Sequence, residues 1–218
     1  DFKGYSELAR VSELRLNSAA FSNAASLQRN DNLGRLQVTK VEGINKDGLY
    51  DQIYMLGSRS FAIWTTDWQL VFDSGDQLER VAAQAMSRFF NTSDDETRFD
   101  QKSDARGTEP EELAVGRVGG RQYVFIAPER IGGIYVYDIT NPKAPVFQQY
   151  INYRNFAIDP AAVCEKNKPK SDQCSRTGDL GPEGILFIAA DQSPIRVPLV
   201  AITNEVSDST TLYRVDER

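Results

Sequence analysis

The stretch that decides the fold is residues 109–150, which read EPEELAVGRVGGRQYVFIAPERIGGIYVYDITNPKAPVFQQY. It is built from four short runs rich in β-branched and aromatic residues: LAVGRV (113–118), YVFIA (123–127), GIYVYDI (133–139) and PVFQQYI (145–151). Turn-forming residues separate the runs, among them Gly119-Gly120 and Asn141-Pro142. Runs with this length and punctuation predict antiparallel strands joined by tight turns. Four such strands in succession make a meander, which is the unit of a propeller blade.

Two other segments repeat this pattern. The earlier one contains LGRLQVTKV, YDQIYMLG, SFAIWTT and LVFDSG, which predict a second four-stranded meander. The later one contains three runs, GILFIAA, PLVAITNE and TTLYRVDE. We therefore expect an all-β fold of the β-propeller type, with about three four-stranded antiparallel blades at roughly residues 31–75, 109–151 and 181–218.

Charged residues recur at equivalent places in these units. Glu111 and Glu183 each follow a proline that opens a strand, and Glu129 aligns with Glu205. Generic β-meanders resemble one another by chance, which is the alternative explanation. The shared Pro-Glu openings and the shared acidic positions favour a true repeat.

The number of units predicts an incomplete ring. Propellers typically have about 4–8 blades, so three do not close. The last unit has only three predicted strands, and the edge of its final strand would expose unpaired backbone groups. We therefore expect residues 1–218 to form a single partial propeller domain, the C-terminal part of a larger ring, with the N-terminal remainder of the same propeller as its partner. A second candidate to complete the final blade is VSELRLN (11–17).

Two insertions interrupt the repeats. Residues 76–90 have apolar positions three and four apart, which predicts a helix with Asp76 as its N-cap. Residues 160–178 contain Cys164 and Cys174 in the polar stretch CEKNKPKSDQC. Free surface thiols and a metal site are alternatives, but free cysteines are usually buried and the pair lacks further metal ligands. A local disulfide that staples this loop fits better, and it implies an oxidising compartment.

The composition excludes several function classes. The net charge is −6, which disfavours nucleic acid as a partner because phosphate binding needs a basic face. No apolar run approaches the roughly 18–20 residues that span a bilayer. The chain has no histidine, which excludes Ser–His and Cys–His catalysis and histidine-ligated zinc. Any chemistry must therefore rely on carboxylates, arginine, lysine and tyrosine.

A set of motifs resembles the choice-of-anchor I domain: LGRLQVT, YDQIYMLGSRSFAIW, LVFDSGDQLE, FDQKSDARGTEPEE, ERIGGIYVYDITNPKAPVFQQYIN, GDLGPEGILFI and NEVSDSTT. This is a mostly bacterial family of secreted and surface-anchored β-propellers. The resemblance implies a secreted, periplasmic or cell-surface protein, in a family with phosphatase-like labels but little established activity. The chain departs from the family at 45–51, NKDGLYD, where members usually carry an acidic calcium-type turn.

Candidate site residues are those expected to converge at the mouth of the propeller. Oxygen ligands from several carboxylates would suit Ca²⁺, and guanidinium groups would suit a small phosphorylated ligand held by the same cation. The predicted metal ligands are Glu111, Glu183, Asp104 and Asp179, and the predicted substrate-binding residues are Arg59, Arg106, Arg130, Glu129 and Glu205.

Structural interpretations of the same residues stay open. A glutamate after a strand-opening proline often bonds backbone N–H groups, and Glu129 and Arg130 would also serve as ion pairs between blades. The acidic run 94–96 is expected to be a solvated loop, and Trp64 and Trp68 to pack within a blade rather than to form a sugar platform.

The sequence supports two functions. The first is a non-catalytic secreted or periplasmic propeller that binds a partner at the surface and is stabilised by a cation. The alternative is a Ca²⁺-dependent phosphoesterase that uses the clustered carboxylates. The absence of a nucleophile–base pair favours the first.

Overall fold

The computed structural model describes residues 6–164 and 171–216, and in these the chain is mostly antiparallel β-sheet with a few short helices. The expected all-β class is confirmed. The chain forms two compact units: residues 1–58 with 103–107, and residues 59–102 with 108–218. None of the helices in the described ranges has the length and hydropathy of a membrane-spanning segment.

The first unit is small and has little regular structure. Strands β1 (Leu8–Arg10) and β2 (Gln37–Thr39) pair as a two-stranded antiparallel sheet. A 3-10 helix, η1 (Val11–Glu13), follows β1, and a single helical turn, α1 (Ala24–Leu27), precedes β2. The core of the unit is a cluster of Val11, Leu14, Val38 and Tyr50.

The meander predicted over 31–75 does not form. Its first run gives only β2, and its second gives isolated bridges such as Val38 with Met55. Glycines with positive φ, at 43, 48 and 57, break this part of the chain into tight loops, so no run is long enough to pair along a blade. Its last two runs form a separate hairpin in the second unit, β3 (Ala62–Trp64) with β4 (Leu70–Asp73).

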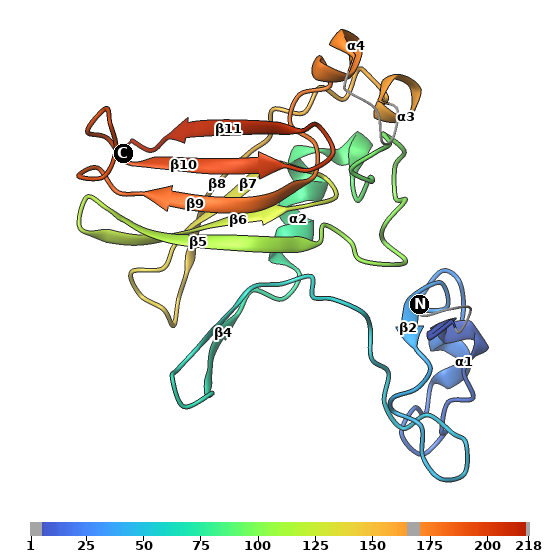
Figure 1. The fold of residues 1–218 in the computed structure, drawn as a ribbon. Helices are drawn as coiled ribbons and strands as arrows, with labels where there is room; N and C mark the ends of the chain where they lie inside the picture. Colours follow the sequence, from blue (N-terminus) through green and yellow to red (C-terminus); the bar gives the residue numbers. More distant parts are fainter. Residues whose placement is uncertain (1–5, 165–170, 217–218) are drawn as a thin grey trace. The chain divides into compact units, whose positions relative to one another are not determined.

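The second unit contains the four-stranded sheet that residues 109–150 predict. Its strands are β5 (Pro110–Val118), β6 (Arg121–Pro128), β7 (Ile134–Asp138) and β8 (Val146–Ile151). They pair antiparallel in chain order (Figure 1). A three-stranded sheet follows, formed by β9 (Pro182–Ile188), β10 (Leu199–Asn204) and β11 (Ser209–Arg214), also in chain order.

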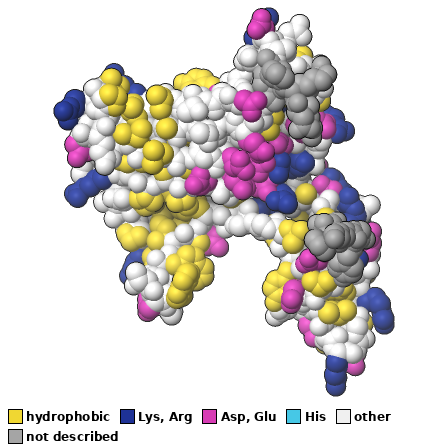
Figure 2. Space-filling view, in the orientation of Figure 1, with side chains coloured by type: hydrophobic (Ala, Val, Ile, Leu, Met, Phe, Trp, Pro, Cys, Tyr) yellow, Lys and Arg dark blue, Asp and Glu magenta, His cyan; other side chains and the backbone are white. Residues whose placement is uncertain are grey.

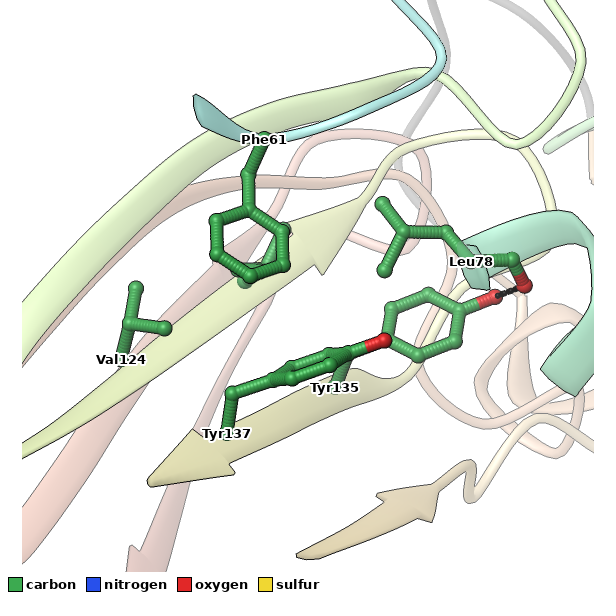
Figure 3. Packing of buried hydrophobic residues seen from close by; sticks show 6 residues of the cluster. Phe61, Leu78, Val124, Tyr135 and Tyr137 are labelled. Atoms are coloured by element: carbon green, nitrogen blue, oxygen red, sulfur yellow. Dashed lines mark hydrogen bonds between the residues drawn. The ribbon is translucent and has the colours of Figure 1, made fainter. Parts of the chain in front are cut away.

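One face of the four-stranded sheet packs against a helix and the hairpin. Alternation along β6 and β7 places Val124, Ile126, Tyr135 and Tyr137 on this face. They contact Phe61, beside the hairpin, and Leu78 of helix α2 (Gln77–Ala85) (Figure 3). The predicted helix therefore exists, and a short 3-10 helix, η2 (Ser87–Phe89), follows it.

The opposite face packs against the three-stranded sheet. Phe125, Ile134 and Val136 contact Val200 and Ile202 of β10 in a second core cluster. The central strands β6 and β7 are thus covered on both sides, as their nearly continuous apolar sequences require.

The outer face of the three-stranded sheet exposes a row of apolar side chains. Leu186 and Leu212 flank Ala201 in one row across the strands, and both leucines are exposed. In the described part of the chain β11 pairs with β10 alone. Residues 11–17, offered as a partner for β11, instead form η1 and a bridge from Leu16 to Tyr50 in the first unit.

The expected disulfide is present. Cys164 and Cys174 are bonded, with their Cα atoms 4.9 Å apart. It joins two helical turns, α3 (Pro160–Val163) and α4 (Asp172–Ser175). Residues 165–170 lie outside the described residues.

Candidate functional site

Three carboxylates meet where β5 begins and β6 ends. Glu109 directly precedes β5, Glu111 is the second residue of β5, and Glu129 directly follows β6. The antiparallel pairing sets Pro110 opposite Pro128, and the Glu129 amide donates to the Glu109 carbonyl at 2.8 Å. One carboxylate oxygen from each of the three glutamates lies within 4.8 Å of the other two. We call these three residues the carboxylate cluster.

A β-bulge in β5 sets the directions of the Glu111 and Glu112 side chains. The register shifts between Pro110 and Glu112, so Glu111 is the extra residue of the bulge. Glu111 joins the carboxylate cluster, whereas the next residue, Glu112, accepts a hydrogen bond from the Ile185 amide of β9 at 2.9 Å. Glu109 itself has a φ of 49°, a left-handed conformation that is uncommon for residues other than glycine. Bulges and such backbone outliers concentrate at functional sites.

A single arginine holds the cluster from one side. Arg130 Nη1 lies 2.8 Å from Asp94 Oδ1 and 2.8 Å from Glu129 Oε1, and its Nε contacts Glu109 Oε2. The Arg130 side chain is only 18% exposed, and its three carboxylate partners are less exposed still. The single positive charge of Arg130 therefore faces three carboxylates and does not neutralise all of them.

The pKa values record this excess of negative charge. The pKa of Glu129 is raised to about 7, mainly by burial; Arg130 opposes the shift, and Glu109, Asp94 and Glu111 add to it. Burial alone would lower the pKa of Arg130, but the neighbouring carboxylates outweigh it and the pKa is raised. Figure 2 shows acidic side chains gathered over the end of the second unit from which β5 starts.

A buried polar loop supports the site from behind. Asn91, Thr92, Ser93 and Asp94 are all buried, so the expectation that 94–96 is a solvated loop is wrong for Asp94. The buried guanidinium of Arg154 donates to the carbonyls of Ser93 (2.6 Å), Arg130 (3.2 Å) and Glu96. Burial lowers its pKa to about 10. Arg154 therefore fixes the loop against the turn that carries Glu129 and Arg130.

The predicted metal ligands have different surroundings. Glu111 lies in the carboxylate cluster. Asp179 accepts hydrogen bonds from Thr211 Oγ1 (2.8 Å), Tyr213 Oη (3.1 Å) and Ser209 Oγ (3.3 Å), which tie it to β11. Glu183 is exposed on β9. Asp104 belongs to the first unit, where it pairs with Arg10 at 3.0 Å.

The predicted substrate-binding residues are largely engaged in ion pairs. Arg59 Nη1 lies 2.9 Å from Glu79 Oε1, and Arg130 and Glu129 belong to the site described above. Arg106 is an exposed residue of the first unit. Glu205 is exposed, and its amide donates to the Gly181 carbonyl at 2.7 Å.

Sequence reasoning missed Glu109, Asp94 and Arg154. Glu109 directly precedes the Pro-Glu opening that was singled out, so its position was the one available signal. Arg154 has no local signal, because it acts on backbone carbonyls far away in the chain.

The chain was compared with known proteins. The family model of the choice-of-anchor I domain matches residues 1–142. Gigasin-3a from Magallana gigas is 27% identical over 196 residues, which cover 87% of this chain and 67% of that protein. Mesenchyme-specific cell surface glycoprotein from Strongylocentrotus purpuratus is 28% identical over 133 residues, which cover 53% of this chain and 17% of that protein. No solved structure matches.

Proposed function

Because this chain belongs to the choice-of-anchor I domain family, we propose that it is a non-catalytic binding module of a secreted or cell-surface protein, stabilised by Ca²⁺ at the carboxylate cluster. The name of the sea-urchin relative and the disulfide both support an extracellular or surface location. The proposed cation site rests on the convergence of Glu109, Glu111 and Glu129.

The donor set suits a hard cation. The three glutamates offer only oxygen, and Ca²⁺ takes such ligands at about 2.3–2.6 Å, so ligands around one ion lie within about 5 Å of one another. The 4.8 Å limit on the three oxygens meets that requirement. Zinc prefers nitrogen and sulfur ligands, and the chain has no histidine and only two cysteines, both in the disulfide.

The backbone makes the set rigid. Glu109 and Glu129 are joined by a backbone hydrogen bond, and Glu111 is fixed by the bulge of β5. Glu111 is exposed, which leaves a side open to solvent for entry of the ion and for water ligands. A bound cation would join the start of β5 to the end of β6 and offset the excess of negative charge.

Thermal unfolding with and without Ca²⁺ tests this function. A ligand that binds only the folded state at 100 times its Kd adds about 2.7 kcal/mol to the free energy of unfolding, which corresponds to several degrees in Tm. Glu111→Gln should abolish most of the Ca²⁺-dependent rise, whereas Glu183→Gln, an exposed Pro-Glu residue on β9, should leave it intact. Equal Tm values in Ca²⁺ and EDTA would remove the cation from the proposal.

We also propose that the stacked sheets belong to a β-propeller. The four-stranded sheet packs on both faces, while the outer face of the next sheet still exposes Leu186 and Leu212. A further blade from the remainder of the same propeller would cover that face, and a separate strand from the same remainder would pair with β11. Amide hydrogen exchange of β11 should therefore be slower in a full-length relative than in this chain alone; equal rates would argue against the ring.

The arginines do not strengthen the phosphoesterase alternative. Arg59 and Arg130 are already paired with carboxylates, so a phosphate would have to displace those partners. We expect no turnover of p-nitrophenyl phosphate with or without Ca²⁺. Turnover that Arg130→Gln abolishes would make the alternative the better account.

A further inference from the structure

The tip of the β3–β4 hairpin exposes two tryptophans. Trp68 is 81% exposed and Trp64 is 52% exposed, with Leu70 exposed beside them. The expectation that both tryptophans pack within a blade is therefore wrong. The hairpin projects from the sheets of the second unit (Figure 1), and hydrophobic side chains gather on it (Figure 2).

The register of the hairpin explains this exposure. Ile63 pairs with Phe72, and both pack against the core cluster around Phe61. Trp64 is the next residue of β3, so its side chain points to the opposite face, where it pairs with Leu70. One face of the hairpin therefore anchors it and the other presents the indole.

The tip is held rigidly by its own hydrogen bonds. The Thr65 amide donates to the Gln69 carbonyl at 2.9 Å, and the Gln69 amide donates to Thr65 Oγ1 at 2.9 Å. The Trp68 amide donates to the Thr65 carbonyl at 3.0 Å. Trp68 has a φ of 63°, a left-handed conformation that is unfavourable for a bulky residue. The turn thus holds the largest side chain in an unfavourable backbone conformation while exposing it to water, which is typical of a binding residue.

Charge decides which partner fits. Residues 60–73 contain no lysine or arginine and two aspartates, Asp67 and Asp73. Asp67 directly precedes Trp68, so an anionic membrane or an anionic polymer would meet repulsion at the tip. Insertion into a neutral bilayer would bury the Asp67 carboxylate next to the indole, which is costly. The partner is therefore uncharged and offers both apolar surface and hydrogen-bonding groups.

We propose that the tip binds a neutral polysaccharide, with Trp64 and Trp68 as the platform. The C–H bonds of a pyranose face carry partial positive charge and are attracted to the negative face of an indole. The hydroxyl groups at the rim of the sugar require polar partners, and Thr66, Asp67 and Gln69 lie between or beside the two tryptophans. β-1,4-linked glucans present such flat faces repeatedly. The proposal is independent of the carboxylate cluster.

Intrinsic fluorescence provides the test, because Trp64 and Trp68 are the only two tryptophans of the chain. Titration with cellohexaose or N-acetylchitohexaose should shift the emission to the blue and protect it from acrylamide quenching. Trp68→Ala should weaken binding at least tenfold while Trp64 continues to report. Ile195→Ala, which removes another exposed apolar side chain (60% exposed) from a loop elsewhere, should bind like the wild type.

Two outcomes would overturn the proposal. One is the absence of any change with neutral oligosaccharides while far-ultraviolet circular dichroism shows a folded protein. The other is the same change produced instead by phosphatidylcholine vesicles, by heparin or by a protein partner. EDTA should not affect sugar binding, which separates failure of this proposal from failure of the cation site.

Discussion

Replacement of Arg130 by glutamine tests the electrostatics of the candidate site. The substitution removes the guanidinium that contacts Asp94 and Glu129 at 2.8 Å and also contacts Glu109. It leaves three largely buried carboxylates without that partner. Removal of one member of a buried ion pair typically costs about 3–5 kcal/mol, because the other charges stay desolvated.

The structure sets the magnitude within that range. Arg130 is 18% exposed, so water reaches part of the site, and we expect a loss of about 3 kcal/mol at pH 8. Loss of the positive charge raises the native pKa of Glu129 further, because Arg130 lowers that pKa in the wild type. The folded variant then binds protons more readily than the unfolded chain, so its deficit should shrink as the pH falls to 5.

Urea unfolding at pH 8 and pH 5 measures this effect. With an m value near 2 kcal/mol per molar, the midpoint should fall by about 1.5 M at pH 8 and by clearly less at pH 5. Arg214→Gln is the matched control: its pair with Asp216 is exposed, with Arg214 63% accessible, and should be worth about 0.5 kcal/mol or less. A loss below 1 kcal/mol for Arg130→Gln, or one independent of pH, would refute the reasoning.

Three further predictions concern single residues. The pKa of Glu129 is raised from 4.5 to about 7, so its contribution to stability is full below pH 4.5 and is lost as the pH rises through 7. Glu129→Gln should remove this pH dependence from the free energy of unfolding in urea. Parallel pH profiles for variant and wild type would contradict it. Tyr135→Phe removes a buried hydroxyl that donates to a carbonyl of α2 at 3.0 Å and should cost about 1–2 kcal/mol in chemical unfolding. Tyr137→Phe is the control, because the buried Tyr137 hydroxyl has no hydrogen-bond partner among the described residues, and it should be close to neutral. Equal losses would show that the hydrogen bond is unimportant. Gly116→Ala would place a Cβ atom 2.4 Å from the Phe187 ring between β5 and β9 and should lower stability by about 1–3 kcal/mol in the same assay; an unchanged midpoint would mean that the two sheets separate easily.

The four-stranded sheet could be predicted because its information is local. Its strands follow one another with short turns, so neighbours in sequence are neighbours in the sheet. The apolar runs of β6 and β7 also indicated strands covered on both faces.

The segment 31–75 could not be predicted in the same way. Its runs have similar composition, but β2 pairs with β1, which lies almost thirty positions earlier. The pairing depends on a separate cluster around Val38 and Tyr50 rather than on a turn between adjacent strands. Local sequence patterns do not show which distant strand β2 pairs with.

The candidate site was predictable only in part. The Pro-Glu repeat drew attention to Glu111, and the alignment of the units drew attention to Glu129. Their convergence with Glu109 depends on a bulge and a left-handed residue that the sequence does not announce. The burial of Asp94 depends on Arg130 and Arg154, which lie 36 and 60 positions away in the chain.

The most direct test of the proposed cation site is a crystal structure of the protein grown with Ca²⁺, with anomalous diffraction data to identify the ion. We expect an anomalous peak bounded by carboxylate oxygens of Glu109, Glu111 and Glu129 at about 2.3–2.6 Å. The peak should disappear in crystals of Glu111→Gln. Crystals with ample Ca²⁺ that show no peak there, or a peak only beside another carboxylate such as Asp179, would contradict a calcium site at the carboxylate cluster.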